Sequence, residues 1–365
     1  MTYLMAIGTK KGLFTASSRD RRDWDIQGPV GPDGDSTGPS GVYAVGIDRR
    51  RATPRILAGG DSAHYGPSVW HSDDLGKSWT EPQEAPIRFG ANDGASLERA
   101  WQFSFGPGPD TVYAGVEPHA LFRSDDGGLT FGLNRALWDH PHRSEWFPGA
   151  GGAAIHTVLP HPDDPESLLV AMSTGGVYAS NNGGRSWVPR NNGIEADFMP
   201  DRFPTFGQCV HKVARAGSNR ERLYAQNHGG VYRSDDEGAT WVSIADGLPS
   251  DFGFAIVAHP SRDDTVFSFP VSSAMERFPT QHRLQVYRSD DAGRSWHAMN
   301  DGLSSGPYFG IVLRDAACTD DEDTDPGFYF GTRCGDVYAA RDSDGQWHQV
   351  VGHLPDVLCV RVARV

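Results

Sequence analysis

The sequence predicts an all-β protein, a seven-bladed β-propeller built from four-stranded blades. The main observation is an octapeptide of the form Ser-x-(Asp/Asn)-x-Gly-x-(Ser/Thr)-(Trp/Phe), which recurs along the chain and is first complete at residues 72–79. The second is composition, because 44 glycines, 25 prolines and 10 tryptophans in 365 residues suit many short strands joined by tight turns. No long segment with helical spacing of apolar residues competes with this pattern.

The spacing of the repeats predicts the number of blades. Each copy ends on an aromatic residue, and these residues lie 55, 52, 56, 54, 55 and 51 positions apart; they are Trp24, Trp79, Phe131, Trp187, Trp241, Trp296 and Trp347. The first and last copies are decayed. A period of this length fits one four-stranded propeller blade, so seven copies predict seven blades.

Each repeat is expected to contribute four strands, counted from the centre of the ring outward. The innermost strands are expected at residues 42–48, 100–105, 155–159, 210–215, 254–259 and 310–314. The second and third strands follow closely, as at residues 167–172 and 176–180. The octapeptide then forms the turn into the fourth strand, where Ser and Asp side chains bond turn amides and the aromatic residue is buried between sheets.

The two ends of the chain predict how the ring closes. The N-terminus opens on a second-type strand at residues 4–8, and the C-terminus ends on an apolar run at residues 358–365 that lacks a partner. This last run is predicted to be the innermost strand of the N-terminal blade, which removes the exposed edges of an open array. All seven units would then form a single domain spanning residues 1–365.

Charge and cysteine content restrict the partners of the protein. The formal net charge is minus 14, which disfavours nucleic acid and anionic membranes because phosphate contacts require a basic surface. Residues 1–12 show no charged start followed by an apolar core, and no segment has the roughly 18 apolar residues of a membrane span. We therefore expect a cytoplasmic protein whose four cysteines are free thiols.

The repeats resemble the Asp-box, or bacterial neuraminidase, repeat of sialidases, xyloglucan-active glycoside hydrolases, sortilin-type receptors and photosystem assembly factors. The resemblance covers the whole chain and implies a sialidase-like propeller of the glycoside hydrolase type. It does not define the chemistry, because the boxes are structural in all of these families. The chain departs from sialidases in having seven units, and its similar tripeptide, Pro54-Arg55-Ile56, has the wrong order and opens an internal strand.

The functional site is predicted on the face opposite the octapeptides. That face carries the long connections at residues 25–41, 82–99, 132–154, 188–209 and 271–284, and long loops on a rigid scaffold concentrate binding residues. The candidate binding residues are Tyr43, His64, Arg99, Trp101, His119, His156, His211, His228 and Arg277. Tyr43, Trp101, His156 and His211 occupy equivalent positions at the start of innermost strands, so they should surround the mouth of the central channel.

Three functions remain open for these residues. In a glycoside hydrolase acting on a carbohydrate or similar polar small molecule, Glu98 and Glu145 are the candidate acid and base, and Arg99 and Arg277 would bind an anionic or polar group. Alternatively, histidines from several blades could bind a catalytic metal ion, although no local spacing assigns a metal site and the cofactor is unknown. The third possibility is a non-catalytic binding or assembly scaffold. The oligomeric state is not defined by the sequence.

Overall fold

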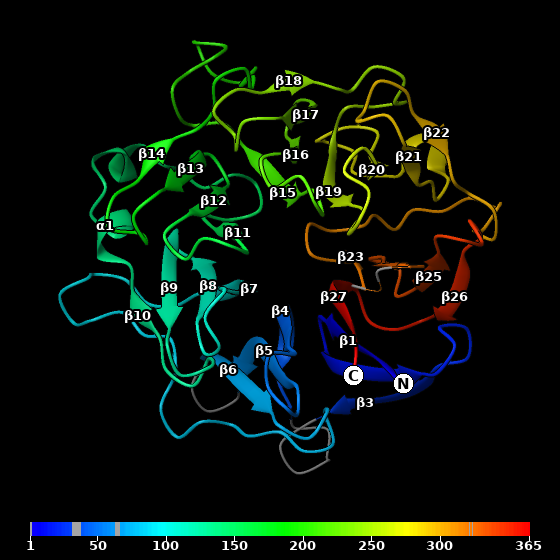
Figure 1. Cartoon of the computed structure of the whole chain (residues 1–365), viewed down its shortest axis with the longest axis horizontal. Helices are drawn as coiled ribbons and strands as arrows, with labels where there is room; N and C mark the ends of the chain where they lie inside the picture. The colour runs from blue at the N-terminus through cyan, green and yellow to red at the C-terminus, as the bar shows by residue number, and fades with distance from the viewer. Residues whose placement is uncertain (1, 31–37, 63–65, 321, 323) are drawn as a thin grey trace.

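Seven antiparallel sheets stand in a ring around a common centre (Figure 1). The structure is a computed structural model that describes residues 2–30, 38–62, 66–320, 322 and 324–365. Successive innermost strands contact one another around the ring. This arrangement confirms the predicted seven-bladed, all-β propeller.

The blades follow one another along the chain. Blade by blade, the strands are β1 (Tyr3–Thr9), β2 (Gly12–Ser18), β3 (Asp25–Val30) with β27 (Val357–Arg364); β4 (Ser40–Asp48), β5 (Arg55–Ser62), β6 (Gly66–Ser72); β7 (Arg99–Phe105), β8 (Val112–Glu117), β9 (Ala120–Ser124), β10 (Gly132–Leu133); β11 (Ile155–Pro160), β12 (Leu168–Met172), β13 (Gly176–Ser180), β14 (Val188–Pro189); β15 (Val210–Arg215), β16 (Leu223–Asn227), β17 (Val231–Ser234), β18 (Val242–Ser243); β19 (Gly253–Ala258), β20 (Val266–Pro270), β21 (Tyr287–Ser289), β22 (His297–Ala298); and β23 (Ala317–Thr319), β24 (Gly327–Gly331), β25 (Val337–Arg341), β26 (His348–Val351).

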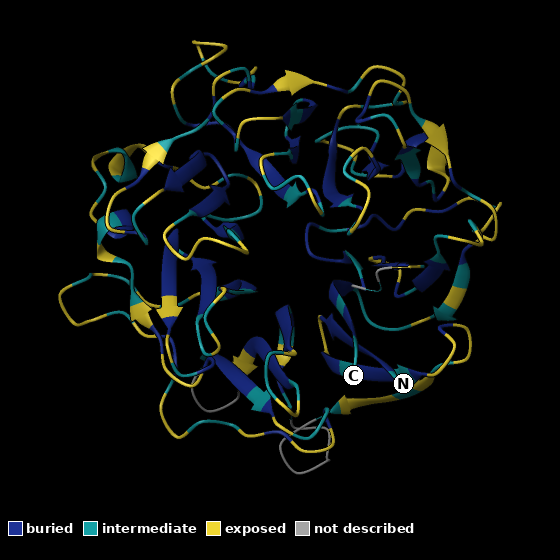
Figure 2. Cartoon of the chain, in the orientation of Figure 1, coloured by how far each residue is buried: buried dark blue, intermediate teal, exposed yellow. Residues whose placement is uncertain are grey.

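Burial decreases from the centre of the ring to its rim (Figure 2). The second strands β8 and β12 are buried along their whole length, whereas the outermost strands β18 and β22 are exposed. In the blade of β4 to β6, the fourth strand is reduced to a single bridge between His71 and Thr80. The core therefore lies between the inner halves of neighbouring sheets.

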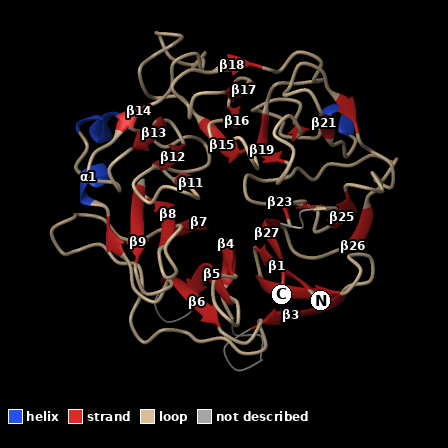
Figure 3. Ribbon diagram, viewed as in Figure 1, coloured by secondary structure: helices blue, strands red, loops and turns tan. Residues whose placement is uncertain are grey.

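Helical segments are few and lie away from the centre of the ring (Figure 3). They are α1 (Arg135–Trp138), and the 3-10 segments η1 (Pro141–Glu145) and η2 (Thr280–His282). The described part of the chain contains no helix of the length and apolarity that a bilayer crossing requires. All four cysteines are free, as expected.

Closure of the ring joins the two ends of the chain in one sheet. Strand β27 pairs antiparallel with β1, from Tyr3 opposite Arg364 to Thr9 opposite Val357. The same sheet continues through β2 to β3. The predicted closure by the C-terminal strand is therefore confirmed.

Side chains of the octapeptide satisfy the backbone of the turn it forms. In the copy that follows β17, Ser234 Oγ accepts a bond from Gly238 N at 2.8 Å, and Asp236 Oδ1 accepts one from Thr240 N at 2.8 Å. Gly238 has a φ of +85°, a conformation that residues with a Cβ resist. Trp241 then donates from Nε1 to the carbonyl of Arg190 in the neighbouring blade at 2.9 Å. The repeat thus connects adjacent sheets without a ligand.

One predicted strand is wrong. Residues 310–314 form no strand, and the innermost strand of that blade is β23, which begins at Ala317. The preceding segment reaches toward the centre of the ring (Figure 1), where Asp315 forms a parallel bridge with Cys359. Ion pairs from Lys212 and Arg361 hold Asp315 there, so polar contacts in the channel replace the expected ladder.

Candidate functional site

Four of the predicted site residues lie where innermost strands break their pairing register. Tyr43, Trp101, His156 and His211 each fall inside such a break, in β4, β7, β11 and β15 respectively. A bulge of this kind turns a side chain out of the regular alternation of the strand. The four residues therefore occupy equivalent bulge positions in four different blades.

A cavity of about 520 Å³ lies at the centre of the ring. Six predicted binding residues line it, namely Tyr43, Arg99, Trp101, His211, His228 and Arg277. Phe252, Phe254, Phe278 and Phe309 add aromatic surface, and Lys10, Arg314 and Arg333 add cationic groups. The cavity therefore combines flat apolar walls with positive charge.

The aromatic wall is held together by contacts between rings and between a ring and a cation. The rings of Tyr43 and Trp101 lie 5.3 Å apart, and the guanidinium of Arg99 lies 4.2 Å from the centre of the Tyr43 ring. Such contacts between a cation and an aromatic face restrict the arginine while leaving its hydrogen-bond donors available. On the opposite wall, Phe254 stacks on His211 at 4.9 Å.

Arg314 is a site residue that the sequence analysis missed. Its side chain is buried, with the residue 8% exposed, yet its Nε has no acceptor among the described residues and none of them forms an ion pair with it. The guanidinium instead lies 5.6 Å from the ring of Trp101 and 5.2 Å from that of Phe254. Burial lowers the pKa of Arg314 to about 10, so the group remains charged at neutral pH. A buried, charged donor without a protein acceptor favours an anionic partner.

One carboxylate that bonds to the cavity wall is that of Glu117, which lies on the predicted face but was not selected as a site residue from the sequence. Its Oε2 accepts bonds from Arg99 Nη1 at 2.9 Å and from Trp101 Nε1 at 3.1 Å. The backbone of Gly152 packs against this carboxylate. Gly152 has a φ of +105°, and a Cβ added there would lie 2.1 Å from Glu117 Oε1. Only glycine allows the backbone to approach so closely. The hairpin register could have revealed Glu117, because it lies directly opposite Arg99.

A second carboxyl group interacts with Arg99. Asp61 lies at the end of β5, and a Cβ added at Gly41 would be 3.0 Å from its Oδ2. Desolvation raises the pKa of Asp61, and the positive charge of Arg99 opposes that rise. Arg99, which lines the cavity, therefore interacts with two carboxyl groups. It forms an ion pair with Glu117, whereas Asp61 has a raised pKa.

Glu98 and Glu145, the candidate acid and base, lie outside the cavity lining. Both side chains are exposed. The backbone N–H of Glu98 donates to the carbonyl of Glu117 at 2.8 Å, and Glu145 ends the 3-10 segment η1. Their predicted catalytic roles are not tested by this placement, although neither contacts the aromatic and cationic walls described above.

The remaining predicted histidines lie around the cavity rather than in its lining. His119 Nε2 is 2.7 Å from the carbonyl of Ser173, and burial lowers the pKa of His119 to about 4. His156 is 1% exposed, and neither of its ring nitrogens has a partner among the described residues. Burial and the nearby charge of Arg314 hold the pKa of His156 well below its usual range. His64 lies outside the described residues.

A buried ionic network lies beside the cavity. Asp315 lines the cavity and forms ion pairs with Lys212 and with Arg361, the latter at 2.6 Å. Gln102 Nε2 also approaches Asp315 Oδ1 at 3.3 Å. Both cationic partners lower the pKa of Asp315, so it remains an ionised structural group.

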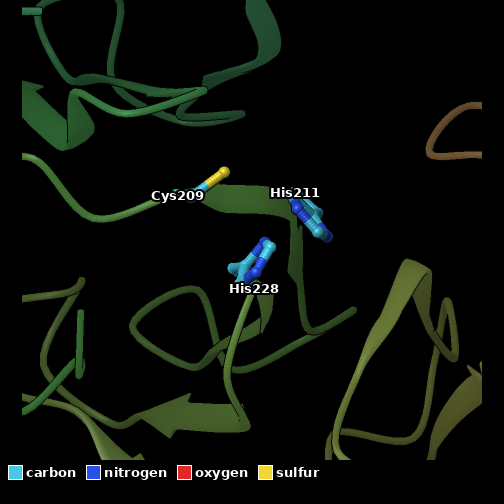
Figure 4. Close-up of side chains that lie close together, drawn as sticks. All are labelled: Cys209, His211 and His228. Carbon is cyan, nitrogen blue, oxygen red and sulfur yellow. The ribbon is translucent and has the colours of Figure 1, made fainter. Parts of the chain in front are cut away.

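Three potential metal ligands meet on one wall of the cavity. Cys209, His211 and His228 each offer one ligand atom, and these atoms all lie within 4.8 Å of one another (Figure 4). Two of these histidines were predicted site residues, whereas Cys209 was not. Burial raises the pKa of the Cys209 thiol and lowers the pKa values of both imidazoles. Burial therefore disfavours the charged form of each of the three groups.

Comparison with known proteins shows which architectures resemble this one. No family model matches the chain. The oligoxyloglucan-reducing end-specific xyloglucanase of Emericella nidulans is 24% identical over 314 residues, which cover 77% of this chain and 37% of that protein. The GH74 xyloglucanase from Xanthomonas campestris superposes with a TM-score of 0.67 at 17% identity, covering 96% of this chain and 52% of that chain. The structure of YCF48 bound to D1 peptide gives a TM-score of 0.52 at 12% identity, covering 85% and 82%.

The chain resembles the GH74 xyloglucanases in fold. It spans 37% of the curated relative and about half of the Xanthomonas enzyme, as the 52% coverage shows. At these identities the likeness establishes the propeller and not its activity. The site chemistry must therefore be argued from the cavity itself.

The cavity can bind a ligand that presents both a flat face and a negative charge. Tyr43, Trp101 and the phenylalanines supply surfaces on which a sugar ring or an aromatic group can stack. Arg314 supplies an unpaired cation at the same place. This combination is specific because a ligand lacking the charge would leave the guanidinium without an acceptor.

Proposed function

We propose that the chain is a carbohydrate-acting enzyme of the glycoside hydrolase type, whose substrate binds in the cavity through an anionic group. The observation that carries this proposal is Arg314, a buried cation between the rings of Trp101 and Phe254 with no ion-pair partner among the described residues. A carboxylate or sulfate group of an acidic saccharide would fill that position. Arg277, which also lines the cavity, would share the charge.

The carbohydrate part of the proposal is supported by two observations. Aromatic side chains form the walls of the cavity, as sugar-stacking platforms require. The chain also resembles xyloglucanases in sequence and in fold, although it spans only part of their length. Because the whole relatives are longer, their substrate is not transferred to this chain.

The candidate acid and base of the proposed reaction are the carboxyl groups of Asp61 and Glu117, which do not line the cavity themselves but interact with Arg99 of its wall. Asp61 has a raised pKa, as a proton donor needs, and Glu117 is held as an ion pair by Arg99. A two-carboxylate mechanism would use Asp61 to protonate the leaving group and Glu117 to assist the attack. Glu98 and Glu145 stay as alternatives for these roles.

A panel of matched saccharides tests the proposed function. Oligogalacturonates and neutral galacto-oligosaccharides differ at C6 in carrying a carboxylate or a hydroxymethyl group, and glucuronic and glucose oligosaccharides form a second pair. We expect an acidic member to bind at least about tenfold more tightly than its neutral partner, because a charged hydrogen bond contributes about 1.5–3 kcal/mol. Calorimetry would measure binding, and release of reducing ends would measure hydrolysis.

The outcomes of this panel separate the candidate functions. Binding with hydrolysis supports the enzyme, whereas binding without hydrolysis favours the non-catalytic binding role. Equal binding of acidic and neutral members would contradict the anionic-substrate proposal. Arg88→Met serves as a matched control, because Arg88 is an exposed arginine that does not line the cavity.

A further inference from the structure

Cys209, His211 and His228 are held by two paired strands of one blade. His211 lies in β15, Cys209 directly precedes that strand, and His228 directly follows β16. The backbone N–H of His228 donates to the carbonyl of Cys209 at 2.9 Å, which fixes the two residues opposite each other. A group built on paired strands is positioned more rigidly than one on loops.

Hydrogen bonding orients His211 as a metal ligand. Its Nδ1 lies 2.6 Å from the carbonyl oxygen of Gly253, which can only accept, so Nδ1 carries the proton. The other ring nitrogen, Nε2, is then deprotonated and free to bind a cation. Metal-binding histidines are commonly oriented by such a bond to a backbone carbonyl.

Packing holds His228 against His211. Their rings lie 5.6 Å apart, and Phe252 contacts both, at 5.6 Å from His211 and 5.3 Å from His228. Donors bound to a tetrahedral zinc ion at about 2.0–2.3 Å lie about 3.5 Å from one another. The ligand atoms, which lie within 4.8 Å of one another, therefore need to close by only about 1 Å.

We propose that Cys209, His211 and His228 bind a zinc ion whose fourth coordination position opens into the cavity. Thiolate and imidazole are donors that zinc prefers, and three protein ligands leave one position of the tetrahedron open. The Cys209 thiol transfers its proton to solvent when the metal binds. All three residues line the cavity, so the open position faces the space in which a ligand would lie.

The charges near the site define the fourth ligand. Zinc and one thiolate leave a net positive charge, and Arg277 and Arg314 line the same cavity. The open position is therefore expected to bind hydroxide or an anionic oxygen of a ligand rather than a neutral group.

Cobalt substitution tests this site without any saccharide, so its result is independent of the proposed function. Chelator-treated full-length protein is titrated with Co²⁺, and absorption spectra are recorded. We expect about one Co²⁺ per chain, with a thiolate-to-cobalt charge-transfer band in the near ultraviolet and strong visible bands of tetrahedral cobalt. Subsequent addition of Zn²⁺ should displace the cobalt and abolish both sets of bands.

Matched variants assign the spectrum to the three residues. Cys209→Ser should abolish the charge-transfer band, and His228→Asn should weaken binding by at least about tenfold. Cys334→Ser and His156→Asn are controls, because Cys334 is a second free thiol in the cavity and His156 lies outside the ligand group. Circular dichroism of each variant establishes that it is folded.

Two results would each overturn the zinc site, and a third would assign the sulfur ligand to another cysteine. One is cobalt binding without a sulfur band in folded wild-type protein, and the other is an unchanged band in Cys209→Ser. Loss of the band in Cys334→Ser with retention in Cys209→Ser would also contradict the assignment. Elemental analysis after purification from zinc-supplemented medium should show about one zinc per chain in the wild type and much less in folded Cys209→Ser.

Discussion

At the scale of single residues, the site is defined by groups that lack an ordinary partner. Arg314 is buried without an acceptor among the described residues, whereas Arg361, also near the channel, is paired with Asp315. This contrast distinguishes the proposed ligand-binding cation from a structural one. Asp315 and Lys212 are paired with each other in the buried ionic network, so they are not expected to take part in chemistry.

Substitution of carboxyl groups tests which of them act in hydrolysis. On the saccharide that gives turnover, Glu117→Gln should reduce kcat by at least about 100-fold, because a positioned acid or base contributes about 10²–10⁴-fold. Glu98→Gln and Glu145→Gln should leave kcat close to wild type, since among the described residues it is Glu117 whose carboxylate bonds to Arg99 and Trp101 of the cavity wall. A large loss in Glu98→Gln or Glu145→Gln with little effect of Glu117→Gln would reverse the assignment.

The sequence predicted part of this residue-level picture. Tyr43, Trp101 and His211 could be placed at the channel mouth because equivalent positions of a repeat point the same way. Arg314 could not, since its position depends on a segment that leaves the repeat pattern and crosses toward the centre. Cys209 and His228 are neighbours only through the pairing of β15 with β16, which local spacing in the sequence does not display.

At the scale of elements, the octapeptide is a turn whose Ser and Asp side chains accept hydrogen bonds from backbone N–H groups of the same turn. Its period predicted seven blades because each copy forms one local unit. The strand expected at residues 310–314 does not form, because its position depends on contacts outside the repeat. Ion pairs of Asp315 with Lys212 and Arg361 override the apolar pattern of that segment. Local patterns therefore defined the scaffold, while long-range ionic contacts shaped the site.

Removal of one serine hydroxyl tests the role of the octapeptide. Ser234 is buried, and its Oγ accepts a bond from Gly238 N. Ser234→Ala should leave that N–H without a partner and destabilise the protein by about 1–3 kcal/mol. The midpoint of urea unfolding would measure this loss against Ser304→Ala, an exposed control. Equal midpoints for the two variants would show that the hydrogen bond contributes little.

At the scale of the whole molecule, pairing of β1 with β27 closes seven blades into one ring. The cavity lies at the centre and draws residues from most of the blades, so the site depends on this closure. The closure could be predicted from the sequence, because the strands at the two ends of the chain did not complete a blade separately. The cytoplasmic location expected from the sequence stays a prediction.

Buried histidines predict how the stability of the whole ring depends on pH. The pKa values of His119 and His259 are lowered to about 4 by burial, below the usual value of about 6.5 in an unfolded chain. Both are neutral in both states above pH 6.5. As the pH falls from 6.5 to 4, the unfolded chain takes up protons that the folded protein excludes, so stability decreases.

Urea unfolding at pH 7.5 and pH 5.0 measures this dependence. Each histidine contributes a slope of at most about 1.4 kcal/mol per pH unit in that window. His119→Gln should reduce the slope, whereas His297→Gln should not, because His297 is exposed. A pH-independent midpoint between 7.5 and 5.0 would contradict this account of the buried imidazoles.

The central claim is that the cavity binds an anionic ligand through Arg314. The most direct measurement is calorimetric titration of wild type and Arg314→Met with the acidic saccharide that binds best and with its neutral partner. Arg314→Met keeps the bulk of the side chain and removes the charge, so it should bind the acidic saccharide at least about tenfold more weakly and abolish the preference over the neutral one. Undiminished preference for the acidic saccharide in folded Arg314→Met would contradict the claim.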